Sequence, residues 1–428
     1  MLTAGVVVLL LLLLAIGTPI GFALVVAGAA GLIGKGGLDM ALGVLATSPA
    51  SSVNSYEMVS VPMFMLMAEF VILSGIADQI FRSAATWVGR IPAGLAMATT
   101  LAGAGFAAIS GSSTAAAATL ASTTVPAMLK QGYEPRLALG VVAISGTLAM
   151  LIPPSIALIL YGLIANVSVG KLLIAGIIPG LIVTAAIMLT VRYLVWRNPA
   201  AAPAGQSYPL VEKLRTLKEV GPMLLLFACV TGAIYTGIAT PTEASALGAL
   251  GAFLLALHSG NLDFASANRA LVKATRSTCM VLMIILGAMI FGYFLALTQL
   301  TQGLVLWVKA LALPAWIIVS IILLAKMSLG FVMDQAAIIV LTVPVVLPIV
   351  VAIGYDPVWF GVIMVVTAEV GMVTPPVGLN AYVVARYTGL PVGDVFRGVI
   401  PHVVAHFIVI VLMIVFPQII LWAPSQMR

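Results

Sequence analysis

The sequence "LIPPSIAL" at Leu151–Leu158 places two consecutive prolines inside a long apolar segment. A proline has no amide hydrogen and crowds the carbonyl four residues earlier, so Pro153 and Pro154 leave the carbonyls of Ala149 and Met150 without helical partners. In hydrocarbon an unpaired carbonyl is costly unless it faces protein, water or an ion. The stretch therefore predicts a broken helix that lines a site.

The composition identifies a polytopic membrane protein. Of the 428 residues, 62% are hydrophobic and 7% are charged, whereas soluble domains carry about 25% charged residues. Apolar segments recur from Val6 to Leu421, so the first is expected to span the membrane rather than to be a cleaved signal. A net charge of +6 without basic or aromatic clusters gives no indication of nucleic-acid binding. Cys229 and Cys279 are expected to be free core thiols.

Several landmarks of the sequence recur 222 residues further on. Pro153-Pro154 recurs as Pro375-Pro376, and "GYEP" at Gly132–Pro135 recurs as "GYDP" at Gly354–Pro357. Three further pairs keep this offset, namely "GTP" (17–19) with "ATP" (239–241), "IPA" (91–93) with "LPA" (313–315), and Pro126 with Pro348. This common register predicts an internal duplication rather than a chance recurrence of Gly and Pro.

Each half is expected to contain about five transmembrane helices and one re-entrant hairpin. The spans predicted in the first half lie near residues 4–17, 18–34, 58–81, 137–166 (broken at the prolines) and 171–196. Between them, residues 92–129 form two apolar arms of about 15 residues, which reach only about 22 Å and are too short to cross. Short arms around a Gly/Ser tip predict a hairpin, which needs protein or a cavity to cover its backbone. The second hairpin is expected at 314–351.

The predicted fold class is therefore an all-α polytopic membrane protein built from two repeats. Residues 1–197 form the first repeat, 198–220 a polar cytoplasmic linker, and 221–428 the second repeat. An odd number of crossings in each half makes the second repeat inverted relative to the first. With the N-terminus outside, most of the 19 Lys and Arg residues fall in cytoplasmic loops, as the positive-inside rule requires.

The hairpin tips and the proline breaks supply the candidate Na⁺ ligands. Half-helix ends near the membrane midplane are common ion and substrate sites in transporters, and a hard cation prefers oxygen ligands. The residues expected to bind Na⁺ are Ser110, Gly111, Ser112 and Ser113 at the first tip, Ala149 and Met150, Asp334 at the second tip, and Gly371 and Met372. The alternatives are close helix packing by small residues at the first tip and a helix-capping role for Asp334.

Ser155 and Asn380 follow the two proline pairs and are candidate hydrogen-bond donors to an anionic substrate. Either side chain could instead satisfy neighbouring backbone in a broken helix. Glu69 and Glu369 also lie in apolar segments, and for Glu369 a site role, a proton relay and an interhelical pair all stay open.

Three other polar residues are expected to have ordinary structural roles. Glu243 is expected to begin a helix near an interface. His402 and His406 are spaced as half of a metal site, but nothing supplies further ligands, so we expect an ordinary helix face. No Walker A sequence or nucleophile motif is present, which argues against ATP hydrolysis and enzymatic activity.

The order and spacing of the paired motifs resemble the large membrane subunit of tripartite ATP-independent periplasmic (TRAP) transporters over nearly the whole chain. The motifs are "ISGSSTA" (109–115), "GYEP" and "IPPS" in the first half, and "MDQAAIIVLTVPVVLP" (333–348), "GYDP" and "TPPVGLN" (374–380) in the second. The resemblance implies an elevator-type importer of organic acid anions in the bacterial inner membrane, driven by Na⁺ and without other cofactors. It also implies two partners, a separate small four-helix membrane subunit and a periplasmic substrate-binding protein.

The resemblance also implies where ions and substrate bind. One Na⁺ would lie between the first tip and the chain just before Pro153, and a second between the second tip and Gly371–Thr374, which adds Thr374 to the ligands. Substrate would lie near Pro154 and Ser155 and near the turn at Pro375 and Pro376. The alternatives are a stand-alone sodium/anion symporter without partners and, from other classes, a channel or an intramembrane enzyme.

Overall fold

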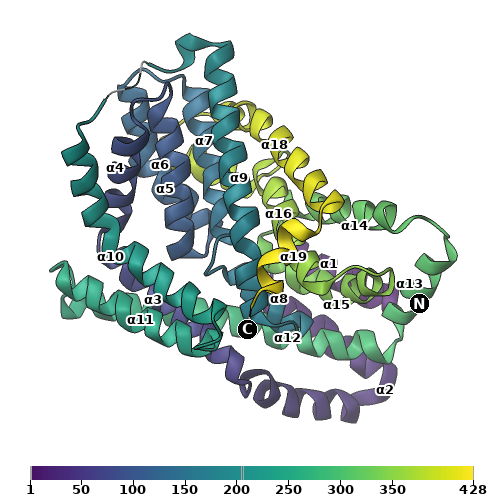
Figure 1. Cartoon of the computed structure of the whole chain (residues 1–428). Helices are drawn as coiled ribbons and strands as arrows, with labels where there is room; N and C mark the ends of the chain where they lie inside the picture. Colours follow the sequence, from purple (N-terminus) through teal and green to yellow (C-terminus); the bar gives the residue numbers. More distant parts are fainter. Residues whose placement is uncertain (1, 204, 206, 428) are drawn as a thin grey trace.

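The computed structural model describes residues 2–203, 205 and 207–427, together with their side chains except those of residues 52, 53, 77 and 108–110. The described chain consists of helices joined by turns and short loops and contains no strand. Seven of the described helices are long and apolar enough to cross a membrane. The chain is therefore a multi-pass integral membrane protein (Figure 1).

The first half contains three 3₁₀ segments besides its α-helices. Its elements are α1 (Leu2–Ala15), α2 (Ile20–Val53), η1 (Tyr56–Val59), α3 (Ser60–Leu73), α4 (Ile76–Val88), α5 (Gly94–Ser110), α6 (Ser113–Lys130), α7 (Pro135–Thr147), η2 (Leu148–Met150), α8 (Ile156–Ala165), α9 (Val169–Arg197) and η3 (Pro199–Ala201).

The second half repeats the order of the principal helices. Its elements are α10 (Leu210–Tyr235), α11 (Pro241–His258), α12 (Phe264–Leu297), α13 (Leu300–Ala310), α14 (Ala315–Gly330), α15 (Gln335–Ala352), α16 (Pro357–Val373), α17 (Leu379–Thr388), α18 (Val392–Val415) and α19 (Gln418–Ser425). The arms of the two expected hairpins are α5 with α6 and α14 with α15. The helix α15 begins and ends 222 residues after α6 begins and ends. Each half of the chain also contains one proline pair that breaks a helix.

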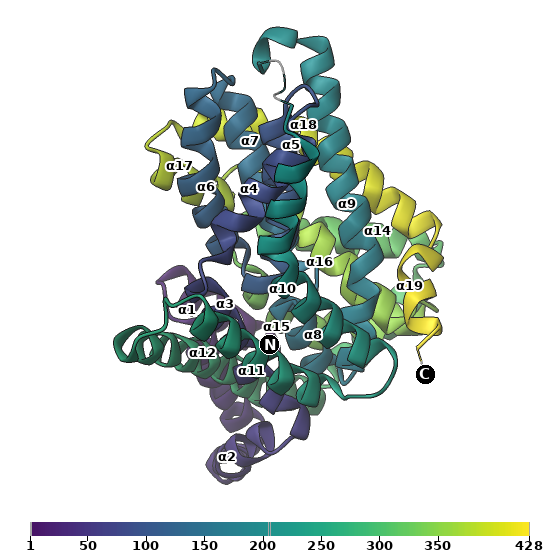
Figure 2. The same ribbon diagram turned by 60° about the vertical axis from the view of Figure 1, so that its left-hand side comes forward.

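Helices of the first half pack against helices of the second half. The helix α2 packs along α12, α3 along α11, α7 along α18, and α9 against α16. Each hairpin also packs on the broken helix of the other half, α6 on α17 and α15 on α8. Figures 1 and 2 show α4–α7 together at the top with α18 beside them, above a layer containing α2, α3, α11 and α12. Neither half is therefore a separate folding unit.

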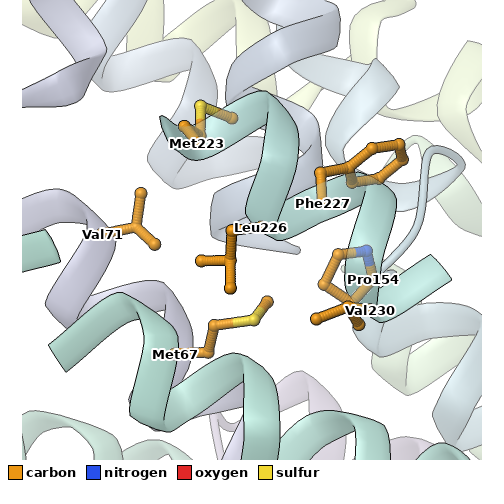
Figure 3. Close-up of a pocket in the computed structure, with 7 residues that line it drawn as sticks. All are labelled: Met67, Val71, Pro154, Met223, Leu226, Phe227 and Val230. Carbon is orange, nitrogen blue, oxygen red and sulfur yellow. The ribbon is translucent and has the colours of Figure 1, made fainter. Parts of the chain in front are cut away.

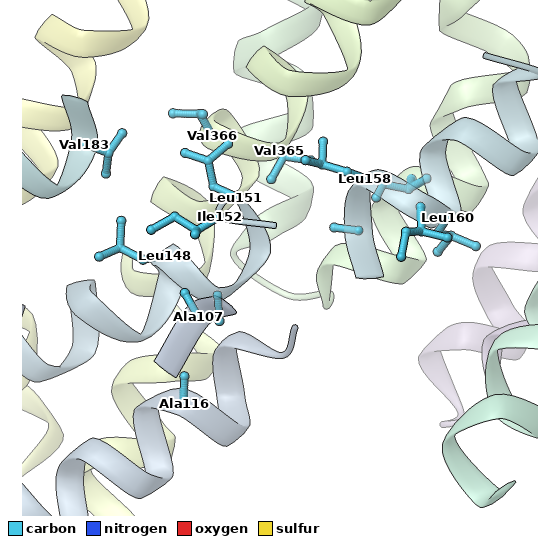
Figure 4. Packing of buried hydrophobic residues seen from close by; sticks show 14 of the residues in the cluster. Ala107, Ala116, Leu148, Leu151, Ile152, Leu158, Leu160, Val183, Val365 and Val366 are labelled. Atoms are coloured by element: carbon cyan, nitrogen blue, oxygen red, sulfur yellow. The ribbon is translucent and has the colours of Figure 1, made fainter. Parts of the chain in front are cut away.

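The core lies around α16 and the first proline break. Every residue of α16 from Val358 to Val373 is buried, because α7, α8, α9, α14, α15 and α18 all contact this helix. Leu151 and Ile152 in the break lie toward Val365 and Val366 of α16 (Figure 4). The break is thus held in a fixed apolar setting.

Three predictions from the sequence are wrong. The span expected at 58–81 is two helices, because the chain turns at Gly75, whose φ is +74°. The span expected at 18–34 continues as α2 to Val53 across a kink at Gly37, whose φ is +82°. Cys229 and Cys279 are free but exposed on the protein surface rather than in the core.

The contact between α7 and α18 depends on two glycines, and this gives a first prediction. A Cβ atom at Gly398 would lie 2.0 Å from the carbonyl oxygen of Arg136 and 3.0 Å from the amide nitrogen of Gly140. Gly398→Ala should therefore separate the helices and cost about 1–3 kcal/mol of stability, measured as a lower melting temperature of the purified protein. Gly393→Ala on the same helix, where nothing lies within 4 Å of a Cβ, is the matched control. Equal melting temperatures for the two variants would contradict this account of the contact.

Candidate functional site

The first proline break satisfies one of its freed carbonyls internally. The Ser155 hydroxyl donates a hydrogen bond to the carbonyl of Met150 and accepts one from the amide of Leu158 at 3.2 Å, so Ser155 also caps α8. Residues 151–155 are all buried. The serine therefore satisfies neighbouring backbone, which is the alternative role considered for it from the sequence. Because a hydroxyl has one hydrogen to donate, a hydrogen bond from Ser155 to a substrate would require breaking the bond to the Met150 carbonyl.

The first hairpin tip lies directly on this break. The arm α5 ends at Ser110, Gly111 follows it with a φ of +55°, and Ser112 caps the following arm α6. A Cβ atom at Gly111 would lie 2.9 Å from Cγ1 of Ile156 and 3.3 Å from the carbonyl oxygen of Pro154. The structure thus brings the first tip to the first break, although the side chain of Ser110 lies outside the described residues.

The other side of the first break faces α3 and α10. Pro154 lines a small apolar cavity of about 20 Å³ between these helices, which is room for no more than about one water molecule. Figure 3 shows the lining side chains Met67, Val71, Met223, Leu226, Phe227 and Val230 around the proline ring. The break therefore forms part of the interface with α3 and α10.

The second break is joined to the second tip by a backbone hydrogen bond. The amide of Gly378 donates to the carbonyl of Phe331 at 3.2 Å. The amide of Thr374 donates to the carbonyl of Gly371 at 3.1 Å, and its hydroxyl donates to the carbonyl of Val370 at 2.6 Å. Residues 375–377 of the second break are exposed, whereas residues 151–155 of the first break are buried.

A side-chain hydrogen bond joins the first tip to the second half of the chain. The Ser113 hydroxyl donates to Oδ1 of Asn380 at 3.3 Å and lies 3.8 Å from the sulfur of Met372. Ser113 and Asn380 are fully buried. Among the described residues Nδ2 of Asn380 has no hydrogen-bond partner. The expected ligands Ser113 and Met372 therefore lie together with Asn380, whereas Ala149 and Met150 belong to the other break.

Asp334 caps the second arm and also lines a large cavity. Its carboxylate accepts a hydrogen bond from the amide of Ala337 at 2.9 Å, so the capping alternative holds. The cavity has a volume of about 1080 Å³ and lies between α1, the start of α2, α12 and the second hairpin. Asp334 is the single charged residue among its described lining residues. A carboxylate in this position is both structurally fixed and open to a solute.

Two buried polar residues in the second hairpin were not singled out as site candidates from the sequence. Gln335 is fully buried, and neither end of its amide has a partner among the described residues. Its position 222 residues after Ser113 is a signal that could have found it. Lys326 on α14 is also buried, and its ammonium lies 5.3 Å from the centre of the Phe360 ring, a cation–π arrangement.

The remaining candidates lie elsewhere. Glu369 is fully buried in α16 without a described partner, whereas Glu69 on α3 forms an ion pair with Lys273 on α12 at 3.0 Å. Glu243 forms a capping box with Thr240 at the start of α11, which confirms its predicted place at a helix start. His402 and His406 are buried on α18, and no group of three metal-ligating side chains occurs within the described chain.

Comparison with known proteins identifies relatives along almost the whole chain. The family described as "Tripartite ATP-independent periplasmic transporter, DctM component" matches residues 7–419. The C4-dicarboxylate TRAP transporter large permease protein of Pseudomonas aeruginosa is 34% identical over 91% of this chain and 93% of its own length. The sialic acid TRAP transporter large permease protein of Vibrio cholerae is 32% identical over 96% of both chains.

Solved structures with low sequence identity share the fold. The YdaH transporter of Alcanivorax borkumensis has a TM-score of 0.65 at 15% identity, covering 88% of this chain and 89% of its own. MtrF of Neisseria gonorrhoeae has a TM-score of 0.62 at 13% identity, covering 90% of this chain and 85% of its own. At these identities the likeness concerns the fold alone.

The role of Ser155 gives a second prediction. Ser155→Ala removes both the cap of α8 and the donor to the Met150 carbonyl, so stability should fall by about 1–3 kcal/mol. Ser155→Thr keeps the hydroxyl and should lose much less. Melting temperatures of the two purified variants test this, and an alanine variant as stable as the threonine variant would refute the assigned hydrogen bonds.

Proposed function

Because the chain belongs to the TRAP transporter family as its DctM-type large permease subunit, we propose that it imports an organic acid anion across the bacterial inner membrane, driven by a Na⁺ gradient. The family consists of permease subunits, so the chain is a transporter subunit and not an enzyme. The transported anion is a carboxylate or sugar acid. Relatives are named for C4-dicarboxylates, sialic acid and isethionate, which are all organic acid anions.

The observation that carries this proposal is the hydrogen bond between Ser113 and Asn380. This bond joins the first hairpin tip to the second broken helix. It uses the amide oxygen of Asn380, and the amide nitrogen Nδ2 of the same buried side chain has no partner among the described residues. Unpaired buried donors are rare because they cost free energy, and an anion is the natural partner for such a donor. Substrate therefore binds between the two tips, close to Asn380 and the exposed Pro375-Pro376 turn.

Sodium ions bind at the two places where a hairpin tip contacts a break. At the first, Gly111 of the tip lies beside the carbonyl oxygen of Pro154, and Ser112 follows it at the start of α6. At the second, the Asp334 carboxylate and the Gly371–Thr374 backbone supply oxygens, which a hard cation prefers. A bound cation near the substrate also lowers the electrostatic cost of moving an anion into the membrane.

The chain consists of two inverted repeats and works by an elevator mechanism. The packing of helices from one half against helices of the other supports this arrangement. In this mechanism the unit containing both hairpins moves against the remaining spans, and the N-terminus is periplasmic. The partners are a small four-helix membrane subunit and a periplasmic substrate-binding protein. The isethionate TRAP transporter permease protein DctMQ of Oleidesulfovibrio alaskensis matches this chain over 64% of its own length.

Uptake into proteoliposomes tests the proposed function directly. The liposomes contain this chain with its small subunit, and radiolabelled organic acid is added with or without the periplasmic protein and an inward Na⁺ gradient. Uptake that needs both supports the proposal. Uptake by this chain alone would instead indicate a self-sufficient symporter, and flux without coupling would indicate a channel.

The charge of Asp334 gives a third prediction. Asp334→Asn keeps a capping side chain but removes a charged ligand, so the Na⁺ concentration for half-maximal uptake should rise about tenfold. Asp356→Asn is the matched control, because Asp356 caps α16 in the same way outside the hairpin. An unchanged Na⁺ dependence in Asp334→Asn would remove the second tip from the sodium site.

The amide of Asn380 gives a fourth prediction. Asn380→Ala should weaken the apparent substrate affinity about 10- to 100-fold, the value of one hydrogen bond to a charged group. Asn380→Asp should be worse, since it places a negative charge beside an anion. Thr388→Val on the same helix, which removes a hydroxyl bonded to the Val384 carbonyl, should leave affinity unchanged. Equal affinities for the aspartate and wild-type proteins would place the substrate elsewhere.

A further inference from the structure

The helix α12 presents one face that changes from basic to apolar. Arg269, Lys273 and Arg276 follow one another at spacings of four and three residues, and Met280 and Met283 continue the same spacing. Residues at such spacings share one face of a helix. The three basic residues are exposed, as is Met280 at 57%, whereas Met283 is half-buried.

The length of α12 places this change of chemistry at a membrane surface. Its 34 residues extend about 51 Å, whereas the hydrocarbon core of a bilayer is about 30 Å thick. The surplus lies at the charged N-terminal end, since the residues after Arg276 are almost entirely apolar. Arg269, Lys273 and Arg276 therefore lie at the level of lipid headgroups.

Two hollows follow each other along the same face. The first, of about 430 Å³, is lined by Asn268, Val272 and the three basic residues. The second begins one turn later at Cys279 and is the apolar cavity of about 1080 Å³. Its walls besides α12 come from α1, the start of α2 and the second hairpin. A hollow bordered by three basic side chains thus opens beside the large apolar cavity.

The charges in the first hollow are only partly compensated. The ammonium of Lys273 lies 3.0 Å from the Glu69 carboxylate on α3, which fixes this part of α12 against its neighbour. Asp263 lies near Arg269, and hydrogen bonds from Ser266 hold the pKa of Asp263 below its usual value. Neither Arg269 nor Arg276 forms an ion pair within 4 Å in the part of the chain that the structure describes.

We propose that this face binds an anionic phospholipid. The guanidinium groups of Arg269 and Arg276 hold its phosphate, because arginine matches phosphate geometry with paired donors. One acyl chain enters the apolar cavity between α12 and α1 and reaches toward the second hairpin. This assignment depends on the membrane location of α12 and not on the transported substrate, so it stands or falls independently of the proposed function.

Native mass spectrometry of the purified full-length protein, equilibrated with defined lipids, tests the proposal. The wild type should retain phosphatidylglycerol in preference to phosphatidylethanolamine. Arg269→Gln with Arg276→Gln should weaken phosphatidylglycerol binding up to about thirtyfold, given the usual contribution of each basic side chain near an anionic lipid surface. Arg192→Gln with Arg197→Gln on α9, which also removes two exposed arginines, should have little effect.

A second arm separates a lipid from a phosphate alone. Soluble glycerophosphoglycerol, which carries the headgroup without acyl chains, should fail to displace the bound lipid at equal concentration. Effective displacement by this headgroup would overturn the acyl-chain part of the proposal. Equal retention of both lipids by the wild type, or equal losses in both double variants, would overturn the site as a whole. If the double variant of Arg269 and Arg276 retains lipid unchanged but fails to co-purify with the small membrane subunit, the face would be a protein interface instead.

Discussion

The energetic cost of an unpaired backbone carbonyl inside a bilayer is the constraint on which this structure depends. Two proline pairs remove amide donors at equivalent places in the two halves, and each break is then covered by a hairpin tip. The first break is further satisfied by the Ser155 hydroxyl. The non-helical backbone at the hairpin tips also needs covering partners inside a membrane. Each hairpin tip therefore covers the backbone freed at a break, and each break covers the backbone of a tip. Their junctions bring backbone oxygen atoms together.

The two junctions are not equivalent, although their local sequences are similar. The first is buried against α3 and α10, whereas Pro375 and Pro376 of the second are exposed. The large cavity extends from Asp334 to the turn between α1 and α2. In the proposed elevator cycle this arrangement corresponds to a site open toward one side. The lipid proposed on α12 would lie in the same cavity, between the second hairpin and the helices it faces.

The sequence was sufficient for the features that depend on local chemistry and failed where tertiary contacts decide. The proline pairs, the hairpin arms and the helix start at Glu243 follow from residue types and spacing, and the structure places them there. The partner of Ser113 could not be predicted, because α6 packs on α17 of the other half as well as on α7 of its own broken helix. The turn at Gly75 was missed since a single glycine in an apolar run is compatible with a continuous span. Cys229 and Cys279 are exposed, because in a membrane protein an apolar segment can face lipid as well as the protein core.

The central claim is that carbonyls whose helical amide partners are removed by the prolines help to bind Na⁺. The most direct test is the melting temperature of the purified protein titrated with NaCl against KCl at equal ionic strength, because a ligand that binds only the folded state stabilises it. The account predicts a rise specific to Na⁺ that is reduced in Pro153→Ala and Pro375→Ala, where a restored amide lets the helix close over its carbonyl. Equal effects of the two salts, or a full Na⁺ effect in both variants, would contradict it.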